Sequence, residues 1–115
     1  GFSEYLHYYG DNLLLGIGRD ADPETGKELG LKLSMFDISD PSNVTEKSKM
    51  ILDAVSEYSV AANYKAIMID PEKNLFGFAY TEGGYSPSGE YPNAYYGVFP
   101  TRREPDLSII GLASL

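Results

Sequence analysis

Three acidic residues in one short loop are the side chains best suited to chemistry. Asp20, Asp22 and Glu24 occupy alternate positions in the segment Asp20-Ala-Asp-Pro-Glu-Thr-Gly26. Ca²⁺ binds several oxygens that converge from a short stretch of chain, so this spacing is compatible with calcium. An EF-hand loop requires glycine at the sixth position and glutamate at the twelfth, whereas here Gly26 is seventh and Leu31 is twelfth. We therefore expect no cofactor, and keep calcium as the alternative to a solvated hairpin loop.

Paired acidic side chains are also what glycoside hydrolysis requires. The two carboxyl groups of such a site lie about 5 to 10 Å apart across a cleft. Candidates are Glu82, Glu90 and Asp106, together with the loop residues Asp20 and Asp22. An acidic surface also presents carboxylates by chance, so a hydrolase acting on a glycan or peptide is the alternative interpretation. A non-catalytic role is the preferred one.

Tyrosines form the best candidate for a binding surface. Half of the ten tyrosines lie in one long loop and its flanks, residues 80–96: Tyr80, Tyr85, Tyr91, Tyr95 and Tyr96. Exposed tyrosine rings make adaptable contacts with sugars and proteins, and a loop of this length is often functional. The alternative is an extended hairpin whose tyrosines pack over neighbouring strands. A protein or a glycan is the partner expected from the first interpretation.

Composition excludes several classes of function. The 115 residues include 17 acidic and 9 basic side chains, so a net charge of −8 argues against nucleic acid as a partner. Cysteine is absent, which excludes disulfides and thiolate chemistry. The only histidine, His7, has tyrosines around it, which is more typical of a packed side chain than of a catalytic one. No apolar run is long enough to predict membrane insertion of this segment.

An internal repeat sets the expected architecture. Asn12-Leu-Leu-Leu-Gly-Ile-Gly18 returns as Asn74-Leu-Phe-Gly-Phe-Ala-Tyr80, at a sequence offset of 74 − 12 = 62. Further along, Phe36 matches Phe99 at an offset of 99 − 36 = 63. Units of this kind usually occur in rings of about four or more blades. The repeat therefore predicts an all-β chain of two four-stranded antiparallel, propeller-like blades, an excerpt of a larger β-propeller that forms one compact body.

Hydrophobic patterns divide the chain into a first blade at residues 1–52, an inter-blade connection at 53–63 and a second blade at 64–115. The expected strands are 5–9, 13–18, 31–38 and 45–52, then 64–69, 75–80, 94–99 and 107–115. A change of phase in the alternation near Met35 and Phe36 predicts a β-bulge there. The residue types of Asp40-Pro-Ser-Asn43 predict a turn.

The last expected strand, Leu107 to Leu115, lacks the charges that protect its counterpart, Thr45 to Leu52. An uncharged apolar edge invites pairing with another strand. We therefore expect that two copies of the chain can form a homodimer through this strand.

Three segments carry a resemblance to a known family. Tyr9-Gly-Asp-Asn-Leu-Leu-Leu-Gly-Ile-Gly18 and Gly30-Leu-Lys-Leu-Ser-Met-Phe-Asp-Ile-Ser-Asp-Pro-Ser-Asn43, with Asp70-Pro-Glu-Lys-Asn-Leu75, are similar to the secreted C-terminal β-propeller domain family of bacteria and archaea. That family is distantly similar to WD-repeat propellers. One departure is at Asn63-Tyr-Lys-Ala66, where the family favours an Asp-His pair before the lysine.

The resemblance implies a ring of blades and export to the cell exterior or surface. It carries no catalytic residues, because the activity of the family is undefined. Taken together, these observations predict a non-catalytic binding or scaffold segment of a secreted or cell-surface β-propeller protein.

Overall fold

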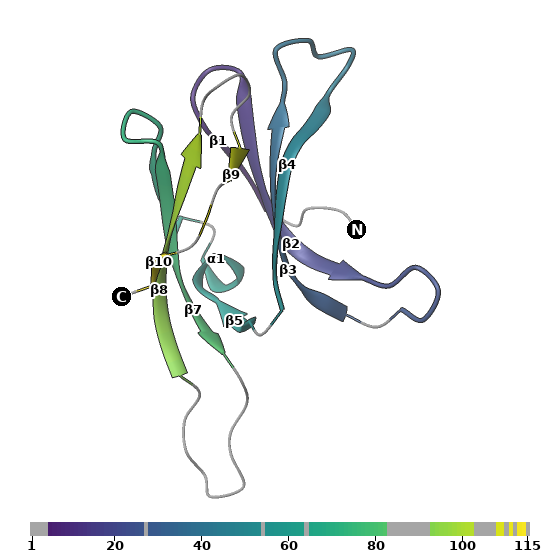
Figure 1. Ribbon diagram of the computed structural model, residues 1–115, viewed down its shortest axis with the longest axis vertical. Helices are drawn as coiled ribbons and strands as arrows, with labels where there is room; N and C mark the ends of the chain where they lie inside the picture. The colour runs from purple at the N-terminus through teal and green to yellow at the C-terminus, as the bar shows by residue number, and fades with distance from the viewer. Residues whose placement is uncertain are drawn as a thin grey trace, which may run out of the picture.

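The chain is almost entirely β-structure. The computed structural model describes residues 5–26, 28–53, 55–63, 65–82, 93–102, 108–109, 111 and 113–114. Two antiparallel sheets contain nearly all of the described elements, and one short helix, α1 (Ser59–Ala62), lies beside them (Figure 1). Within this part of the chain, no helix has the length and apolar character needed to cross a membrane.

The first sheet is a four-stranded meander. Its strands are β1 (Tyr5–Tyr8), β2 (Leu13–Ala21), β3 (Glu28–Asp37) and β4 (Thr45–Leu52), in the order β1-β2-β3-β4. The register between β3 and β4 shifts between Met35 and Phe36, which confirms the predicted bulge. The Asn43 N–H donates to the Asp40 carbonyl at 2.9 Å, which confirms the predicted turn.

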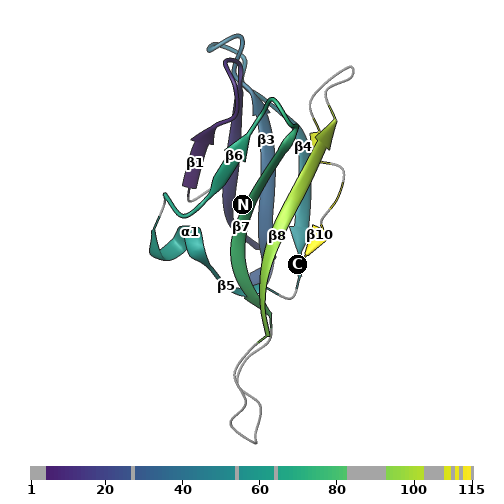
Figure 2. The ribbon, with the colours of Figure 1, turned by 90° about the vertical axis from the view of Figure 1, so that its left-hand side faces the viewer.

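The second sheet is built around a central strand. β7 (Leu75–Glu82) pairs on one side with β8 (Asn93–Arg102) and on the other with β6 (Met68–Asp70) and β5 (Val55–Tyr58). β6 lies along the first part of β7 and β5 along the last part, so the two short strands share one edge (Figure 2). β9 (Ser108–Ile109) and β10 (Ala113–Ser114) both pair with β8.

The expected connection at residues 53–63 contains a strand and a helical turn. Val55, Tyr58 and Val60 are all buried in the core, so β5 and α1 contribute apolar side chains to it. The following strand begins at Met68, later than expected. Asn63 explains why this strand starts late. Its side-chain Oδ1 accepts from the Lys65 N–H and its carbonyl accepts from the Ala66 N–H, and the two hydrogen bonds form a local turn before the strand.

The expected single strand at residues 107–115 is two short strands. From Ile109 to Ala113 the chain advances by four residues, whereas their partners on β8, Thr101 and Val98, are three residues apart. This difference shifts the register by one residue, so β9 and β10 do not form one regular ladder with β8.

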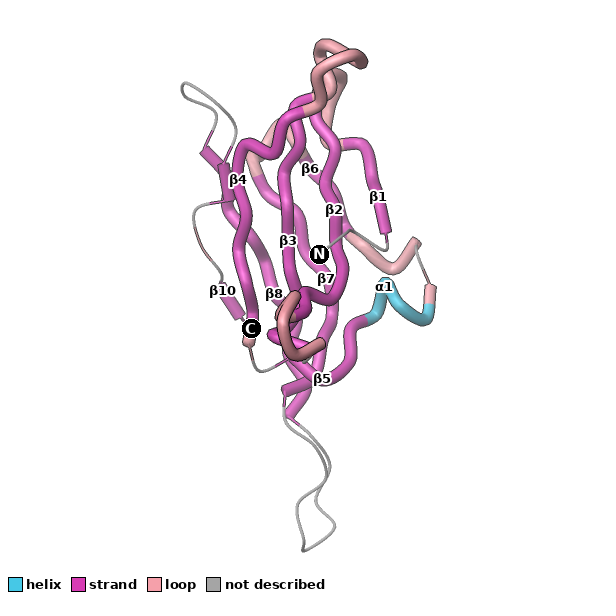
Figure 3. The backbone as a smooth tube through the Cα atoms, turned by 90° about the vertical axis from the view of Figure 1, so that its right-hand side faces the viewer, coloured by secondary structure: helices cyan, strands magenta, loops and turns pink. Residues whose placement is uncertain are grey.

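The two sheets face each other across one core (Figures 1 and 3). The first sheet contributes aliphatic side chains, among them Leu15, Ile17, Leu31 and Leu33, which are fully buried. The second sheet contributes stacked aromatic rings. The Phe99 ring centroid lies 4.9 Å from that of Phe76 and 5.1 Å from that of Phe78.

Polar contacts also tie the sheets together. The buried Tyr9 hydroxyl and Thr101 Oγ1 are hydrogen-bonded at 3.0 Å. The Ile109 N–H donates to Ser48 Oγ at 3.0 Å, which joins β9 to β4. Both contacts link residues that are far apart in the sequence, and they fasten the first sheet to β8 and β9.

Strand pairing confirms the internal repeat. In the first sheet Leu15 pairs with Met35, and in the second Gly77 pairs with Val98. The sequence offsets between these pairs are 77 − 15 = 62 and 98 − 35 = 63, as expected from the sequence. The same offsets relate the pair Leu14 and Phe36 to the pair Phe76 and Phe99.

Unlike faces of the two units pack together. Leu15 and Ile17 lie in the core, but their counterparts Gly77 and Ala79 lie on the opposite side of β7 from the buried Phe76 and Phe78. The face that is inward in the first sheet is therefore outward in the second. The two units are arranged head to tail and are not related by a two-fold axis.

Candidate functional site

Both candidate loops follow the second strand of their unit. The acidic loop joins β2 to β3, and the tyrosine-rich segment joins β7 to β8. The β2–β3 hairpin and the adjoining ends of β7 and β8 lie in the lower half of Figure 1. The repeat offset of 62 aligns Glu82 with Asp20, so both units place an acidic residue at the same strand position.

Two of the predicted tyrosines are brought together by strand register. Tyr80 on β7 pairs with Tyr95 on β8, and their rings stack with centroids 5.5 Å apart and an interplanar angle of 25°. Tyr80 is buried and Tyr95 is half-buried. Offset stacking of this kind stabilises the pair and leaves one side of Tyr95 accessible.

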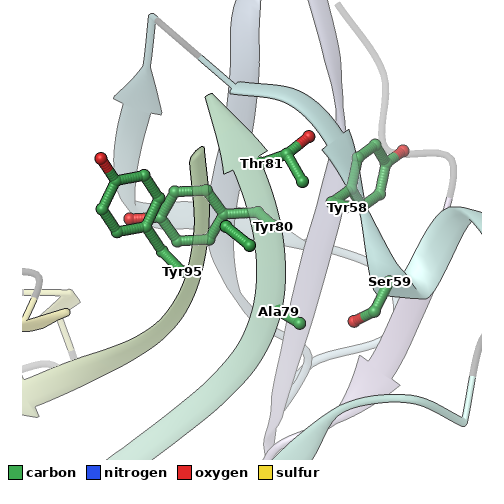
Figure 4. A pocket seen from close by; sticks show the side chains of 7 residues that line it. Tyr58, Ser59, Ala79, Tyr80, Thr81 and Tyr95 are labelled. Atoms are coloured by element: carbon green, nitrogen blue, oxygen red, sulfur yellow. The ribbon is translucent and has the colours of Figure 1, made fainter. Parts of the chain in front are cut away.

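A shallow groove of about 260 Å³ runs beside this pair. Its walls include Tyr58, Ser59, Ala79, Tyr80, Thr81 and Tyr95 (Figure 4). Most of the lining is apolar, with the Ser59 and Thr81 hydroxyls near it. Ser59 Oγ donates to the Ala66 carbonyl at 2.8 Å, which anchors this wall to the turn before β6.

Tyr58 contributes to the groove although it lies in the segment expected to be a connection. Its ring makes an edge contact with Tyr5, with centroids 6.1 Å apart, and the Arg19 guanidinium carbon lies 5.5 Å from its ring centroid. Arg19 Nη1 donates to the Val55 carbonyl at 2.7 Å. These contacts hold the Tyr58 ring in place before any ligand arrives. The apolar spacing of Val55, Tyr58 and Val60 is the signal from which this residue could have been found.

Burial affects the chemistry of Tyr80. Desolvation raises the pKa of its hydroxyl above 10.0, and the nearby Glu82 and Tyr95 raise it further. The hydroxyl is therefore neutral at physiological pH. Tyr80 is suited to hydrogen bonding and stacking, and not to service as a phenolate base.

Of the other predicted tyrosines, the structure describes only Tyr96, and it lies elsewhere. Tyr96 is 37% exposed and belongs to the opposite face of the second sheet, where its Cε1 would lie 2.9 Å from a Cβ at Gly77. Tyr85 and Tyr91 lie outside the described residues. The five tyrosines therefore do not form one surface in the part of the chain that the structure describes.

The acidic loop is a compact hairpin turn. Asp22 Oδ1 accepts from the Glu24 N–H at 2.8 Å, and the Asp22 carbonyl accepts from the Gly26 N–H at 2.8 Å. Asp20 belongs to β2, and its side chain lies outside the described ones. Among the described residues, no group of three metal-ligating side chains converges. One carboxylate oxygen of Asp22 is therefore already used as a hydrogen-bond acceptor within the turn. Calcium binding at this loop stays a prediction.

His7 lies on the inward face of β1, opposite Leu15. Its Nε2 is buried and has no hydrogen-bond partner among the described residues. Burial lowers the pKa of the imidazole below 6.5, so the ring is neutral at physiological pH.

A second hollow, of about 550 Å³, lies at the other end of the molecule. The β1–β2 turn and the β6–β7 turn form its walls, which carry the carboxylates of Asp11 and Glu72. The buried Tyr9 at its base already uses its hydroxyl in the contact with Thr101. This hollow therefore has acidic groups at its rim and an occupied hydroxyl at its base.

Comparison with known proteins gives the class of this fold. The model of the β-propeller domain family matches residues 1–105. The chain belongs to the β-propeller domain family, in agreement with its two repeated antiparallel sheets.

Two archaeal proteins are similar to the chain. An uncharacterised protein of Archaeoglobus fulgidus is 38% identical over 87 residues, which cover 74% of this chain and 12% of that protein. An uncharacterised protein of Methanocaldococcus jannaschii is 41% identical over 76 residues, which cover 66% of this chain and 11% of that protein. The chain thus spans about an eighth or less of the length of either relative. No solved structure matches significantly.

Proposed function

We propose that the chain is a non-catalytic binding segment of a secreted or cell-surface β-propeller protein, and that its tyrosine groove contacts a glycan or a protein. Membership of the β-propeller domain family supports a binding or scaffold role. The stacked Tyr80–Tyr95 pair beside the groove is the observation that carries the more specific proposal.

The chemistry of the groove favours flat, partly apolar ligands. The half-buried Tyr95 ring offers a surface against which a sugar ring or another aromatic side chain can stack. Tyr58 and Tyr80 are already packed, so binding would immobilise few additional side chains. Hydroxyl groups of a ligand would meet the Ser59 and Thr81 side of the groove.

The test is an NMR titration of the chain with a panel of neutral oligosaccharides and of tyrosine- or proline-containing peptides. We expect shift changes for Tyr58, Tyr80 and Tyr95 with at least one panel member. Tyr95→Ala should weaken that binding about tenfold, the equivalent of losing one stacking contact of about 1.4 kcal/mol. Tyr8→Ala is the matched control, because Tyr8 is an exposed tyrosine on the other sheet.

Shift changes confined to residues outside the groove, or binding that Tyr95→Ala leaves unchanged, would overturn the groove as the binding site. Turnover of a panel member would favour the hydrolase alternative. Surface labelling of intact cells that produce the full-length protein tests the proposed location. A protein found only in the cytosolic fraction would contradict it.

A further inference from the structure

The turn between β3 and β4 is exposed along its whole length. β3 ends at Asp37 and β4 begins at Thr45, and residues 39–44 between them are all exposed to solvent. Even the apolar Val44 is 53% exposed. In Figure 1 this turn projects at the upper end of the first sheet. Side chains on it are therefore accessible to another macromolecule as well as to water.

Asp40 holds the turn in shape. Its carbonyl accepts from the Asn43 N–H at 2.9 Å, and its Oδ1 accepts from the Ser42 N–H at 3.0 Å and from Ser42 Oγ at 2.7 Å. Pro41 restricts the backbone between these residues. These hydrogen bonds use the main-chain N–H of Asn43, so they persist when its side-chain amide is modified.

Asn43, Val44 and Thr45 form the sequence Asn-x-Thr, with a residue other than proline in the middle. This is the acceptor sequence of N-linked glycosylation, in which a glycan is attached to the asparagine side chain of an exported protein. Such acceptors lie on surface loops, because the transferring enzyme must reach the amide. The β3–β4 turn meets that requirement.

Other exposed asparagines of the described chain lack this sequence. Asn12 and Asn63 are exposed, but the residues two positions after them are Leu14 and Lys65. Asn63 Oδ1 also accepts from the Lys65 N–H at 3.0 Å. Exposure alone therefore does not distinguish Asn43 from these two. Exposure combined with a hydroxyl two residues later does.

We propose that Asn43 is an N-glycosylation site, modified by an oligosaccharyltransferase that uses a lipid-phosphate-linked glycan as donor. The reaction forms a bond between Asn43 Nδ2 and the anomeric carbon of the first sugar. It breaks the bond between that carbon and an oxygen of the lipid phosphate, which leaves, and one amide proton is released. The inference rests on the proposed export of the protein, because N-linked glycans are added to exported chains.

The position of the site suits a bulky polar group. Thr45 begins β4, the outer strand of the first sheet, and the neighbouring Glu46 and Lys47 are also exposed. A glycan on Asn43 would add to the protection of this edge against pairing with other strands, and would shield Val44 from contact with other proteins. β3 separates this turn from the β2–β3 hairpin, so the tyrosine groove at the lower end of Figure 1 would remain accessible.

The experiment is mass spectrometry of tryptic peptides from the full-length protein, recovered from the surface fraction of an archaeal host that glycosylates its own surface proteins. Trypsin cuts after Lys32 and Lys47, so the peptide of residues 33–47 carries Asn43 as its only asparagine. We expect this peptide to gain the mass of one or more sugar residues, with fragment ions that place them on Asn43. Glycopeptides from the host's own surface proteins show that the transferase is active.

Variants of the acceptor sequence test its specificity. Asn43→Gln removes the acceptor amide, and Thr45→Val removes the hydroxyl but keeps a branched side chain, so each should abolish the mass increase. Thr45→Ser keeps a hydroxyl and should retain it. Ser42→Ala is the matched control, because Ser42 lies in the same turn but outside the acceptor sequence. Circular dichroism checks that each variant folds.

An exported protein whose peptide 33–47 carries no sugar would overturn this proposal, while the proposed location and the tyrosine groove would stand. A mass increase that Thr45→Val retains would also overturn it, because the modification would then not depend on the acceptor sequence. A protein found only in the cytosolic fraction would contradict both the proposed location and the glycosylation.

Discussion

Phe36 and Phe99 occupy the same position in the two repeat units, yet their surroundings differ. Phe99 is fully buried between the sheets and stacks on Phe76 and Phe78. Phe36 lies on the outer face of the first sheet and is half-buried. The difference arises because only one of the two equivalent faces has a partner within the described chain. The position of a residue in the repeat therefore determines which residue it pairs with and to which face of the sheet its side chain points. Whether that side chain is buried depends on the neighbouring sheet.

The same comparison explains the small residues of the second unit. Gly77 and Ala79 replace the buried Leu15 and Ile17 of the first unit, and they lie on a face that no other sheet of the described chain covers. Because this face is not packed against another sheet of the described chain, replacing large side chains by Gly77 and Ala79 loses little buried apolar surface. Their small size does leave room for the Tyr96 ring, which lies over Gly77.

The two phenylalanines provide the largest expected contrast. Phe99→Ala removes a ring from the core and should lower the free energy of unfolding by about 3 to 5 kcal/mol. Phe36→Ala should lower it by about 1 to 2 kcal/mol, because the ring is only partly buried in the folded chain. Urea unfolding followed by far-ultraviolet circular dichroism measures both, at chain concentrations where each variant is monomeric. Equal losses would contradict the assignment of the two faces.

Arg19 tests the connection between the units. Arg19→Ala removes the hydrogen bond to the Val55 carbonyl and the contact with the Tyr58 ring, so we expect a loss of about 1.5 to 3 kcal/mol. Arg19→Lys keeps the charge but loses the planar guanidinium, and it should recover only part of this loss. Urea midpoints give both values. If Arg19→Ala costs no more than an ordinary surface substitution, the guanidinium does not join the sheets.

His7 should give a smaller, pH-dependent effect. Burial lowers its pKa in the folded chain below the ordinary 6.5, so below that pH the unfolded chain binds more protons than the folded one. The free energy of unfolding should therefore fall as the pH drops through 6.5, and level off below the folded-state pKa. His7→Phe should remove this part of the dependence.

Urea midpoints between about pH 7.5 and pH 5 measure that slope. The pKa values of Asp37 and Asp40 lie below 3.8, because the side-chain hydroxyls and then the N–H groups of Ser39 and Ser42 donate to the two carboxylates, so their titration does not interfere. A slope that is unchanged in His7→Phe would mean that His7 does not titrate differently in the two states.

Local signals predicted most of the regular structure. The repeat offsets of 62 and 63, the four strands of the first unit, the bulge at Met35 and Phe36 and the turn at Asp40 all follow from patterns visible in the sequence. The strands, the bulge and the turn are set by alternation and by residue types with strong turn preferences. These features can be predicted without knowing how the two sheets pack on each other.

Features that depend on distant partners were not predicted. The burial of β5 requires the first sheet as a neighbour, and the division of the final strand depends on its register with β8. Tyr95 and Tyr96 lie on different surfaces because they are adjacent in sequence and so point to opposite faces of one strand. Tyr58 joins the groove only because β5 pairs with β7.

Nuclear Overhauser contacts between aromatic rings test the head-to-tail arrangement most directly, measured at a concentration where the chain is monomeric. We predict contacts from the Tyr9 ring to the Phe76 ring and from the Tyr5 ring to the Tyr58 ring, whose centroids lie 6.2 and 6.1 Å apart. The Tyr96 ring should show no contact with Leu15 or Ile17. Contacts between Tyr96 and these core residues, with none between Tyr9 and Phe76, would contradict the account, because the second sheet would then present its other face to the first.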